Sequence, residues 1–235
     1  MSGTRSDVRS DVRADARADE GVGGILYGMW FDGSNDTVLF DGSPFNTKTK
    51  GRVTGTFQTT DSGYRSLWAL TDETDTNSDV SIFISVGKIY VVARNNGSTA
   101  LRFITDDRFD DGALHTYDLE VSDSGNTIKV DGILQDVTYT TGSASTVKWA
   151  ADVGDLDVMA IGVRQESSPD GYMAGFIGAT KVYDEDGTTV LWSVNGYGNT
   201  NADWLDQVGS NDGTVSGSPS RAISVNGGAT WAEES

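Results

Sequence analysis

From Ile25 onward the chain consists of short runs in which apolar and polar residues alternate. A period of two is typical of a half-buried β-strand. Turn-forming pairs such as Asp41-Gly42, Asn96-Gly97 and Asp186-Gly187 separate these runs. A short helical turn is expected over 152–157. The pattern predicts strands at 25–31, 36–40, 51–59, 64–70, 80–86, 88–95, 99–105, 114–122, 126–131, 133–140, 156–163, 172–184, 188–194 and 212–216.

Many short strands with almost no helical period indicate an all-β protein. The strand-rich part is too long for an immunoglobulin domain of about 100 residues, so a larger two-sheet antiparallel jelly-roll sandwich is predicted. We expect this sandwich to span 25–223, between an N-terminal arm at 1–24 and a C-terminal tail at 224–235. The large apolar residues expected in its core are Trp30, Phe57, Trp68 and Trp192.

The arm carries a four-residue repeat, RSDVRSDVRADARADE, at positions 5–20. In a helix, like charges would stack at i and i+4, which suits pairing with another chain. In a strand, Arg and Asp would alternate along one face. Both interpretations need a partner, and a disordered tail is the third. We predict an oligomerisation or docking arm whose charged residues are Arg5, Asp7, Arg9, Asp11, Arg13, Asp15, Arg17 and Asp19.

Composition narrows the classes of function. The 235 residues include 35 acids and 17 bases, a formal charge of −18, with no Cys and one His. This charge argues against nucleic-acid binding, which depends on Lys and Arg. Without Cys there are no disulfides or thiolate metal sites. No apolar run approaches the ~18 residues of a membrane helix, so no membrane insertion is expected.

The acid excess has two explanations. Salt screens surface repulsion to within about 3 Å at 1 M, so a chain this acidic suits a halophilic source. The acids are 28 Asp and 7 Glu. Because Asp favours turns and Glu favours helices, a turn-rich β protein would show the same bias.

Four segments, in order along the chain, resemble the concanavalin A-like, laminin G-like jelly-roll family. They are WFDGSNDTV at 30–38, LHTYDL at 114–119, TIKVDG at 127–132, and the stretch from Ala160-Ile161-Gly162 through GYMAGFIGATKVY at 171–183. Ala179-Thr180 stands where the family has an acidic pair. Residues 192–217 resemble the closing strands of such domains in tailed-phage appendage proteins. The resemblance implies a jelly-roll fold and a lectin or adhesion function.

No catalytic residues are predicted. Glycosidases of this superfamily need closely placed carboxylates on one strand face, in an E-x-D-x-x-E arrangement. Glu120 and Asp123 come nearest, but their odd spacing places them on opposite faces of a strand. His115, the one histidine, lies on a predicted strand and is interpreted as a structural residue.

Calcium is the expected cation if one is bound, because hard oxygen ligands abound. Clusters of oxygen ligands also arise by chance in so acidic a chain. One further cluster of aspartates surrounds Arg108 and Phe109. The candidate metal ligands are Asp32, Asn35 and Asp36 in one turn, and Asp75, Asn77 and Asp79 in a second acidic stretch.

Glycan binding requires an exposed aromatic face beside polar groups. A Gly- and Asn-rich loop contains Tyr197 and Trp204, so both are expected at the surface, where they could equally close a sheet edge. With Tyr172 they are the glycan-binding candidates.

These observations favour a structural appendage of a tailed virus: a tail fibre, head fibre or spike. The first twenty residues lack the apolar region of a signal peptide, so common export routes are not expected. The expected partners are sister chains in a homo-oligomer, other virion proteins through the arm, and a host-surface glycan or glycoprotein. A secreted or cell-surface lectin is the first alternative, and a glycan-degrading enzyme is the second.

Overall fold

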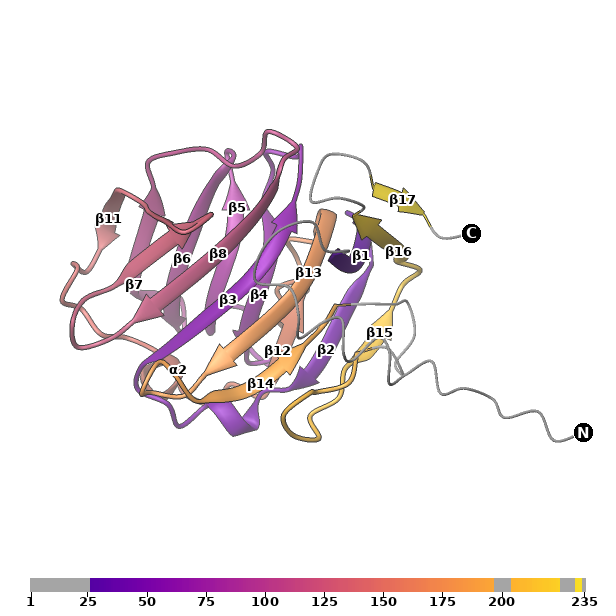
Figure 1. Cartoon of the computed structure of the whole chain (residues 1–235). Helices are drawn as coiled ribbons and strands as arrows, with labels where there is room; N and C mark the ends of the chain where they lie inside the picture. Colours follow the sequence, from indigo (N-terminus) through magenta and orange to yellow (C-terminus); the bar gives the residue numbers. More distant parts are fainter. Residues whose placement is uncertain (1–25, 197–203, 225–230, 234–235) are drawn as a thin grey trace, which may run out of the picture.

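The protein folds as a sandwich of two antiparallel β-sheets, one stacked on the other (Figure 1). The computed structural model describes residues 26–196, 204–224 and 231–233. Within these ranges the two sheets contain nearly all of the regular structure, and the helices are limited to η1 (Ser43–Phe45) and α2 (Ala150–Val153). The predicted all-β, two-sheet antiparallel architecture is confirmed.

The first sheet lies at the front in Figure 1. Its strands follow the order β10-β9-β8-β3-β13-β1-β16-β17, and β14 pairs with β13 beside this path. Neighbouring strands are antiparallel throughout. Their bounds are β1 (Leu26–Asp32), β3 (Gly51–Gln58), β8 (Leu114–Val121), β9 (Thr127–Val130), β10 (Ile133–Leu134), β13 (Ala174–Tyr183), β14 (Val190–Val194), β16 (Ser220–Ser224) and β17 (Trp231–Glu233).

The second sheet lies behind the first and follows the order β11-β7-β6-β5-β4-β12-β2-β15. From β4 to β7 the sheet is a meander, because each strand pairs with the next along the chain. Its bounds are β2 (Thr37–Asp41), β4 (Arg65–Thr71), β5 (Asp79–Ser85), β6 (Lys88–Asn95), β7 (Ser98–Thr105), β11 (Val137–Thr141), β12 (Val158–Ile161) and β15 (Thr214–Ser216).

Most strands lie within a few residues of their predicted positions, and three differences stand out. The run predicted as one strand at 133–140 divides into β10 and β11, which belong to different sheets. The strands β16 and β17 lie where no strand was predicted, and β16 crosses the expected boundary at 223. The helical turn expected over 152–157 overlaps α2 only at 152–153, because α2 begins at Ala150 and ends at Val153. In the part of the chain that the structure describes, no helix is long and apolar enough to span a membrane.

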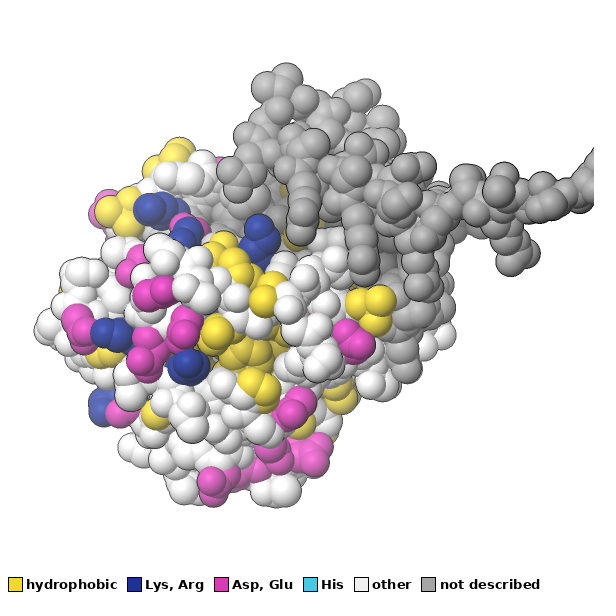
Figure 2. Space-filling model, turned by 60° about the horizontal axis from the view of Figure 1, so that its bottom comes forward, with side chains coloured by type: hydrophobic (Ala, Val, Ile, Leu, Met, Phe, Trp, Pro, Cys, Tyr) yellow, Lys and Arg dark blue, Asp and Glu magenta, His cyan; other side chains and the backbone are white. Residues whose placement is uncertain are grey.

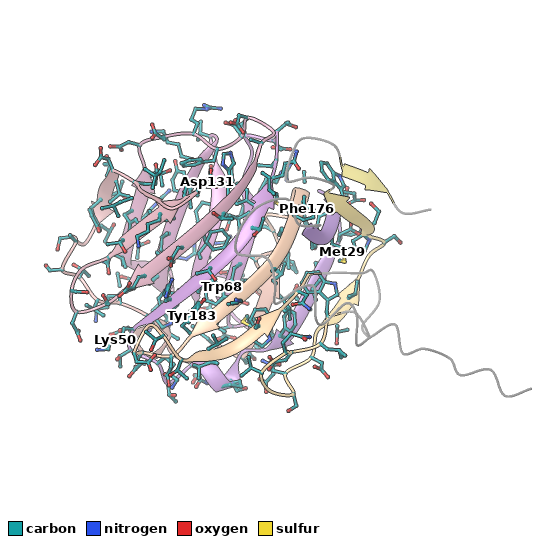
Figure 3. The ribbon with its side chains drawn as sticks, in the orientation of Figure 1. Met29, Lys50, Trp68, Asp131, Phe176 and Tyr183 are labelled. Carbon is teal, nitrogen blue, oxygen red and sulfur yellow. The ribbon has the colours of Figure 1, made fainter. Side chains whose placement is uncertain are left out.

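The core fills the space between the sheets with the inward residues of each strand. Trp68, which is labelled in Figure 3, is buried between the sheets. Its ring stacks on that of Trp149, with ring centroids 5.9 Å apart. Phe57 and Trp192 are also fully buried, as predicted. Trp30 is not, and that prediction is wrong, because 39% of the residue is exposed. Met29 and Phe31, on either side of Trp30, occupy the inward positions of β1. Because side chains alternate along a strand, Trp30 points outward.

Candidate functional site

A pocket of about 290 Å³ lies on the outer face of the second sheet. Alternation along β5 explains its lining: Ile82 and Ile84 point into the core, whereas Phe83 and Ser85 point outward. The same period applies to β6, whose buried Val91 is followed by Val92 on the pocket side. The pocket is lined by Tyr64, Asp79, Phe83, Ser85, Val92, Arg94, Thr99, Arg102, Arg164 and Asp170.

One side of the pocket is formed by residues 162–173, which connect β12 to β13 and are called the strap below. The strap attaches to β4 because Ser66 N–H donates to the Gly171 carbonyl at 2.7 Å. Gly171 has φ +66°, and a Cβ there would lie 2.4 Å from the ring of Tyr64. Only glycine therefore allows the strap to pack this closely on Tyr64.

A row of aromatic rings crosses the pocket from β4 toward β7. Tyr64, just before β4, packs edge-on against Phe83 at 4.5 Å between centroids. Phe83 stacks on Tyr90 of β6 at 5.1 Å, with an interplanar angle of 15°. The guanidinium of Arg102 lies 5.2 Å from the centroid of Tyr90, and that of Arg164 lies 5.3 Å from the centroid of Tyr64. Arginines therefore stack at both ends of the row, in cation–π geometry.

The floor beside this row holds a network of ion pairs. The fully buried carboxylate of Asp79 accepts a hydrogen bond from Arg94 Nε at 2.8 Å. Arg94 Nη2 also donates to Glu166 of the strap at 3.0 Å. Arg164 and Asp170 form a bidentate pair, with Nε to Oδ1 at 2.8 Å and Nη2 to Oδ2 at 2.5 Å. The strap is thus attached to the sheet through charge as well as through its backbone.

Two ionisable groups at the pocket are shifted by burial. Burial raises the pKa of Glu166 to about 7, since the opposing attraction of Arg164 and Arg94 is weaker than the desolvation of the carboxylate. Burial also raises the pKa of Tyr64, so its hydroxyl remains protonated. Tyr64 is therefore a hydrogen-bond donor at neutral pH.

Two polar groups of the pocket have no protein partner among the described residues. These are the hydroxyl of Tyr64 and Nε of Arg102, and both atoms are buried. Buried donors are nearly always hydrogen-bonded to protein, water or ligand. Aromatic faces with a few convergent polar groups are the usual lining of a site for a small organic ligand. The pocket is therefore suited to binding a polar ring-shaped molecule.

The structure places the first predicted metal cluster in a turn stabilised by its own hydrogen bonds. Asp36 is buried, and its carboxylate accepts from the backbone N–H of Asp32 at 2.9 Å and of Ser218 at 2.7 Å. The Asp32 carboxylate accepts from Ser34 N–H at 2.7 Å. The oxygens of both aspartates thus fix the backbone around Asn35.

The second predicted cluster surrounds an arginine. Asn77 Oδ1 and Asp79 Oδ1 both accept hydrogen bonds from Arg94, at 3.1 Å and 2.8 Å. Asp75 accepts from the hydroxyl of Ser78 at 2.5 Å. In the described ranges no three His, Cys, Asp or Glu residues are grouped so that they could hold a metal ion. Calcium binding stays a prediction, which titration of chelated protein with Ca²⁺ would test.

The two predicted glycan-binding aromatics that the structure describes, Trp204 and Tyr172, do not form one site. The expected surface position of Trp204 is wrong: the residue is fully buried, and its Nε1 donates to Met29 Sδ at 3.0 Å. Its ring packs against Phe40 at 6.4 Å. Tyr172 is half-buried at the end of the strap and does not line the pocket. Tyr197, like the arm at 1–24, lies outside the described residues.

The one histidine is engaged on both ring nitrogens. His115 Nδ1 lies 2.8 Å from Asp131 and Nε2 lies 3.1 Å from Asp111. Its ring also packs against Phe57 and Phe109. These contacts link the start of β8 to the turn after β9, which is what a structural histidine does.

Sequence reasoning missed most of the pocket. Strand alternation places Phe83 and Tyr90 on one face of their strands, and this signal was available. The pairing of β5 with β6, which sets Phe83 opposite Tyr90, could not be predicted from that alternation. Nothing in the sequence pattern indicated that the strap would bring Arg164 to the same face, because that contact spans two separate parts of the chain.

No family model matches the chain, and no curated protein sequence matches it. Solved structures do match. The CBM40 module of the Ruminococcus gnavus intramolecular trans-sialidase has a TM-score of 0.55 at 15% identity, over 69% of this chain and 92% of the module. The same module bound to alpha2,3-sialyllactose has a TM-score of 0.53 at 15% identity, over 69% of this chain and 92% of the module. Domains LG4-5 of the mouse laminin alpha1 chain have a TM-score of 0.48 at 15% identity, over 74% of this chain and 47% of the laminin chain.

At this level of identity the likeness shows the fold. The sandwich is a concanavalin A-like jelly roll, as the sequence resemblance implied. The matched CBM40 module is almost completely covered by this chain, so the likeness extends over a whole sugar-binding module.

Proposed function

We propose that this protein is a non-catalytic carbohydrate-binding module that holds a glycan in the pocket on the second sheet. The observation that carries the proposal is the row of Tyr64, Phe83 and Tyr90, which ends beside arginines and includes buried donors without a protein partner. Sugar rings pack their C–H faces on aromatic rings while their hydroxyls take hydrogen bonds. A module of the same fold has been solved with sialyllactose bound, which supports this assignment.

The test is binding of the full chain to a panel of immobilised glycans, followed by calorimetry with those retained. Tyr90→Ala removes the half-buried ring that lies between Phe83 and Arg102 and should weaken binding at least tenfold. Tyr183→Ala is the matched control, since Tyr183 also lies under an arginine, Arg52 at 4.6 Å, but on the first sheet (Figure 3). It should bind like the unaltered protein.

Three results would contradict the proposal. One is the absence of binding to every glycan, and the second is an equal loss in the two tyrosine variants. The third is release of reducing sugar from a bound polysaccharide, which would favour a glycan-degrading enzyme. Thermal melts of both variants verify that each remains folded.

The repeat at 5–20 favours a more specific setting for the module. A virion appendage of a tailed virus would use this arm to join sister chains or other virion proteins, and the sandwich would face the host surface. The resemblance of 192–217 to phage appendage domains supports this setting. Deleting residues 1–20 should abolish assembly and leave the sandwich folded. A truncated protein that still assembles on particles would contradict the docking role.

A further inference from the structure

Where the structure describes the side chains of this acidic protein, most of the basic ones are paired with a carboxylate. Figure 2 shows Lys and Arg side chains directly beside Asp and Glu on the face that it presents. The structure describes the side chains of Arg102 and of five other arginines. Each of those five forms an ion pair: Arg52, Arg65, Arg94, Arg108 and Arg164.

Arg102 differs from these arginines, because among the described residues it forms no ion pair. It lies on β7 opposite Val92 of β6, and both residues line the pocket. Its guanidinium stacks over Tyr90, and its Nε is buried without a hydrogen-bond acceptor. An unpaired arginine is notable here because acids outnumber bases 35 to 17 in the chain.

The carboxylates that line or border the pocket are already engaged. Asp79 and Glu166 accept hydrogen bonds from Arg94, and Asp170 is held in the bidentate pair with Arg164. Among the residues that the structure describes, the pocket therefore offers one cation without an ion-pair partner and no carboxylate that lacks one. A ligand that brings its own negative charge would complete the ion pairing that Arg102 lacks.

We propose that the pocket selects acidic sugars, and that the ligand carboxylate pairs with Arg102, whose guanidinium is held over the ring of Tyr90. This inference rests on the proposed function. Tyr64, at the other end of the aromatic row, donates its hydroxyl to a second oxygen of the ligand. A planar guanidinium fixed over a ring presents its N–H groups in the geometry that a carboxylate accepts. The carboxylate therefore gives both affinity and orientation.

The experiment compares matched sugar pairs by calorimetry on the full chain. The pairs are 3′-sialyllactose with lactose, and methyl galacturonide with methyl galactoside. We expect the acidic member of at least one pair to bind tenfold or more tightly than its neutral partner. Arg102→Gln should remove this preference, so that the acidic and the neutral member of a pair bind with equal affinity. Arg102→Lys should keep part of it, because the charge stays but the planar donor set does not.

Lys129→Gln is the matched control, since it removes one positive charge from an exposed position on the first sheet. It should leave the preference intact, and thermal melts verify the fold of each variant. If acidic and neutral sugars bind equally, and Tyr90→Ala weakens both, the acidic-sugar inference is overturned and the proposed function stands. If no sugar of either kind binds, the proposed function fails and the inference fails with it.

Discussion

The buried Glu166 predicts an unusual dependence of stability on pH. Only 2% of this residue is exposed, and burial raises its pKa from 4.5 to about 7. A carboxyl with a higher pKa in the folded state binds more protons when folded, in the interval between the two values. Stability therefore falls as the pH rises from about 4.5 to about 7. The penalty is absent below this interval and complete above it.

The substitution Glu166→Gln removes the titrating group and keeps an acceptor for Arg94. Each pKa unit corresponds to about 1.4 kcal/mol, so the shift amounts to about 3 kcal/mol of unfolding free energy. The variant should gain this amount relative to the unaltered protein between pH 4.5 and pH 8. Both arginines of the network stay paired in the variant, Arg94 with Asp79 and Arg164 with Asp170.

The assay is urea denaturation of both proteins in half-unit steps from pH 4.5 to pH 8, at constant ionic strength. The quantity of interest is the difference in unfolding free energy at each pH. Glu73→Gln, at an exposed position, corrects for the loss of one carboxyl. A difference that stays flat across the range, or that falls with pH, would refute the reasoning about desolvation.

Three further predictions concern packing and charge. Trp204→Ala should cost about 3–5 kcal/mol of unfolding free energy, measured by urea denaturation, because the ring is fully buried; a cost below about 1 kcal/mol would restore a surface position. Gly162→Ala should cost more than Gly132→Ala in the same assay. Both have φ near +80°, but only at 162 would a Cβ lie 2.5 Å from the ring of Phe31; equal costs would contradict this. Thermal melts should show a higher Tm in molar NaCl than at low salt, and equal values would remove the halophilic interpretation.

Strand positions could be predicted because they depend on neighbouring residues. Alternation sets a period of two over a few positions, and Asp-Gly and Asn-Gly pairs separate many of the runs. The limits of this reasoning appear at Trp30. Its segment was correctly assigned to a strand, but the inward positions belong to its neighbours on either side. A shift of one residue in register exchanges the two faces of a strand, and apolar content alone does not fix that choice.

The burial of Trp204 and the pocket itself could not be predicted in this way. Trp204 is distant in sequence from Met29 and Phe40, against which it packs. A Gly- and Asn-rich neighbourhood suggested a surface loop, but contacts from two other strands decide the burial of the ring.

The sequence by itself therefore determined the all-β class, the jelly-roll resemblance, the turn positions and the charge balance, since each depends on composition or on residues close together in the chain. Only the tertiary structure decided which side chains meet. The pocket brings Tyr64, Phe83, Arg102 and the strap together through strand pairing and a crossover between sheets, with Tyr90 stacked beside Phe83. Those contacts are separated by up to about a hundred residues, and no local period encodes them. The free arginine became visible only when every other described arginine had its carboxylate partner in space.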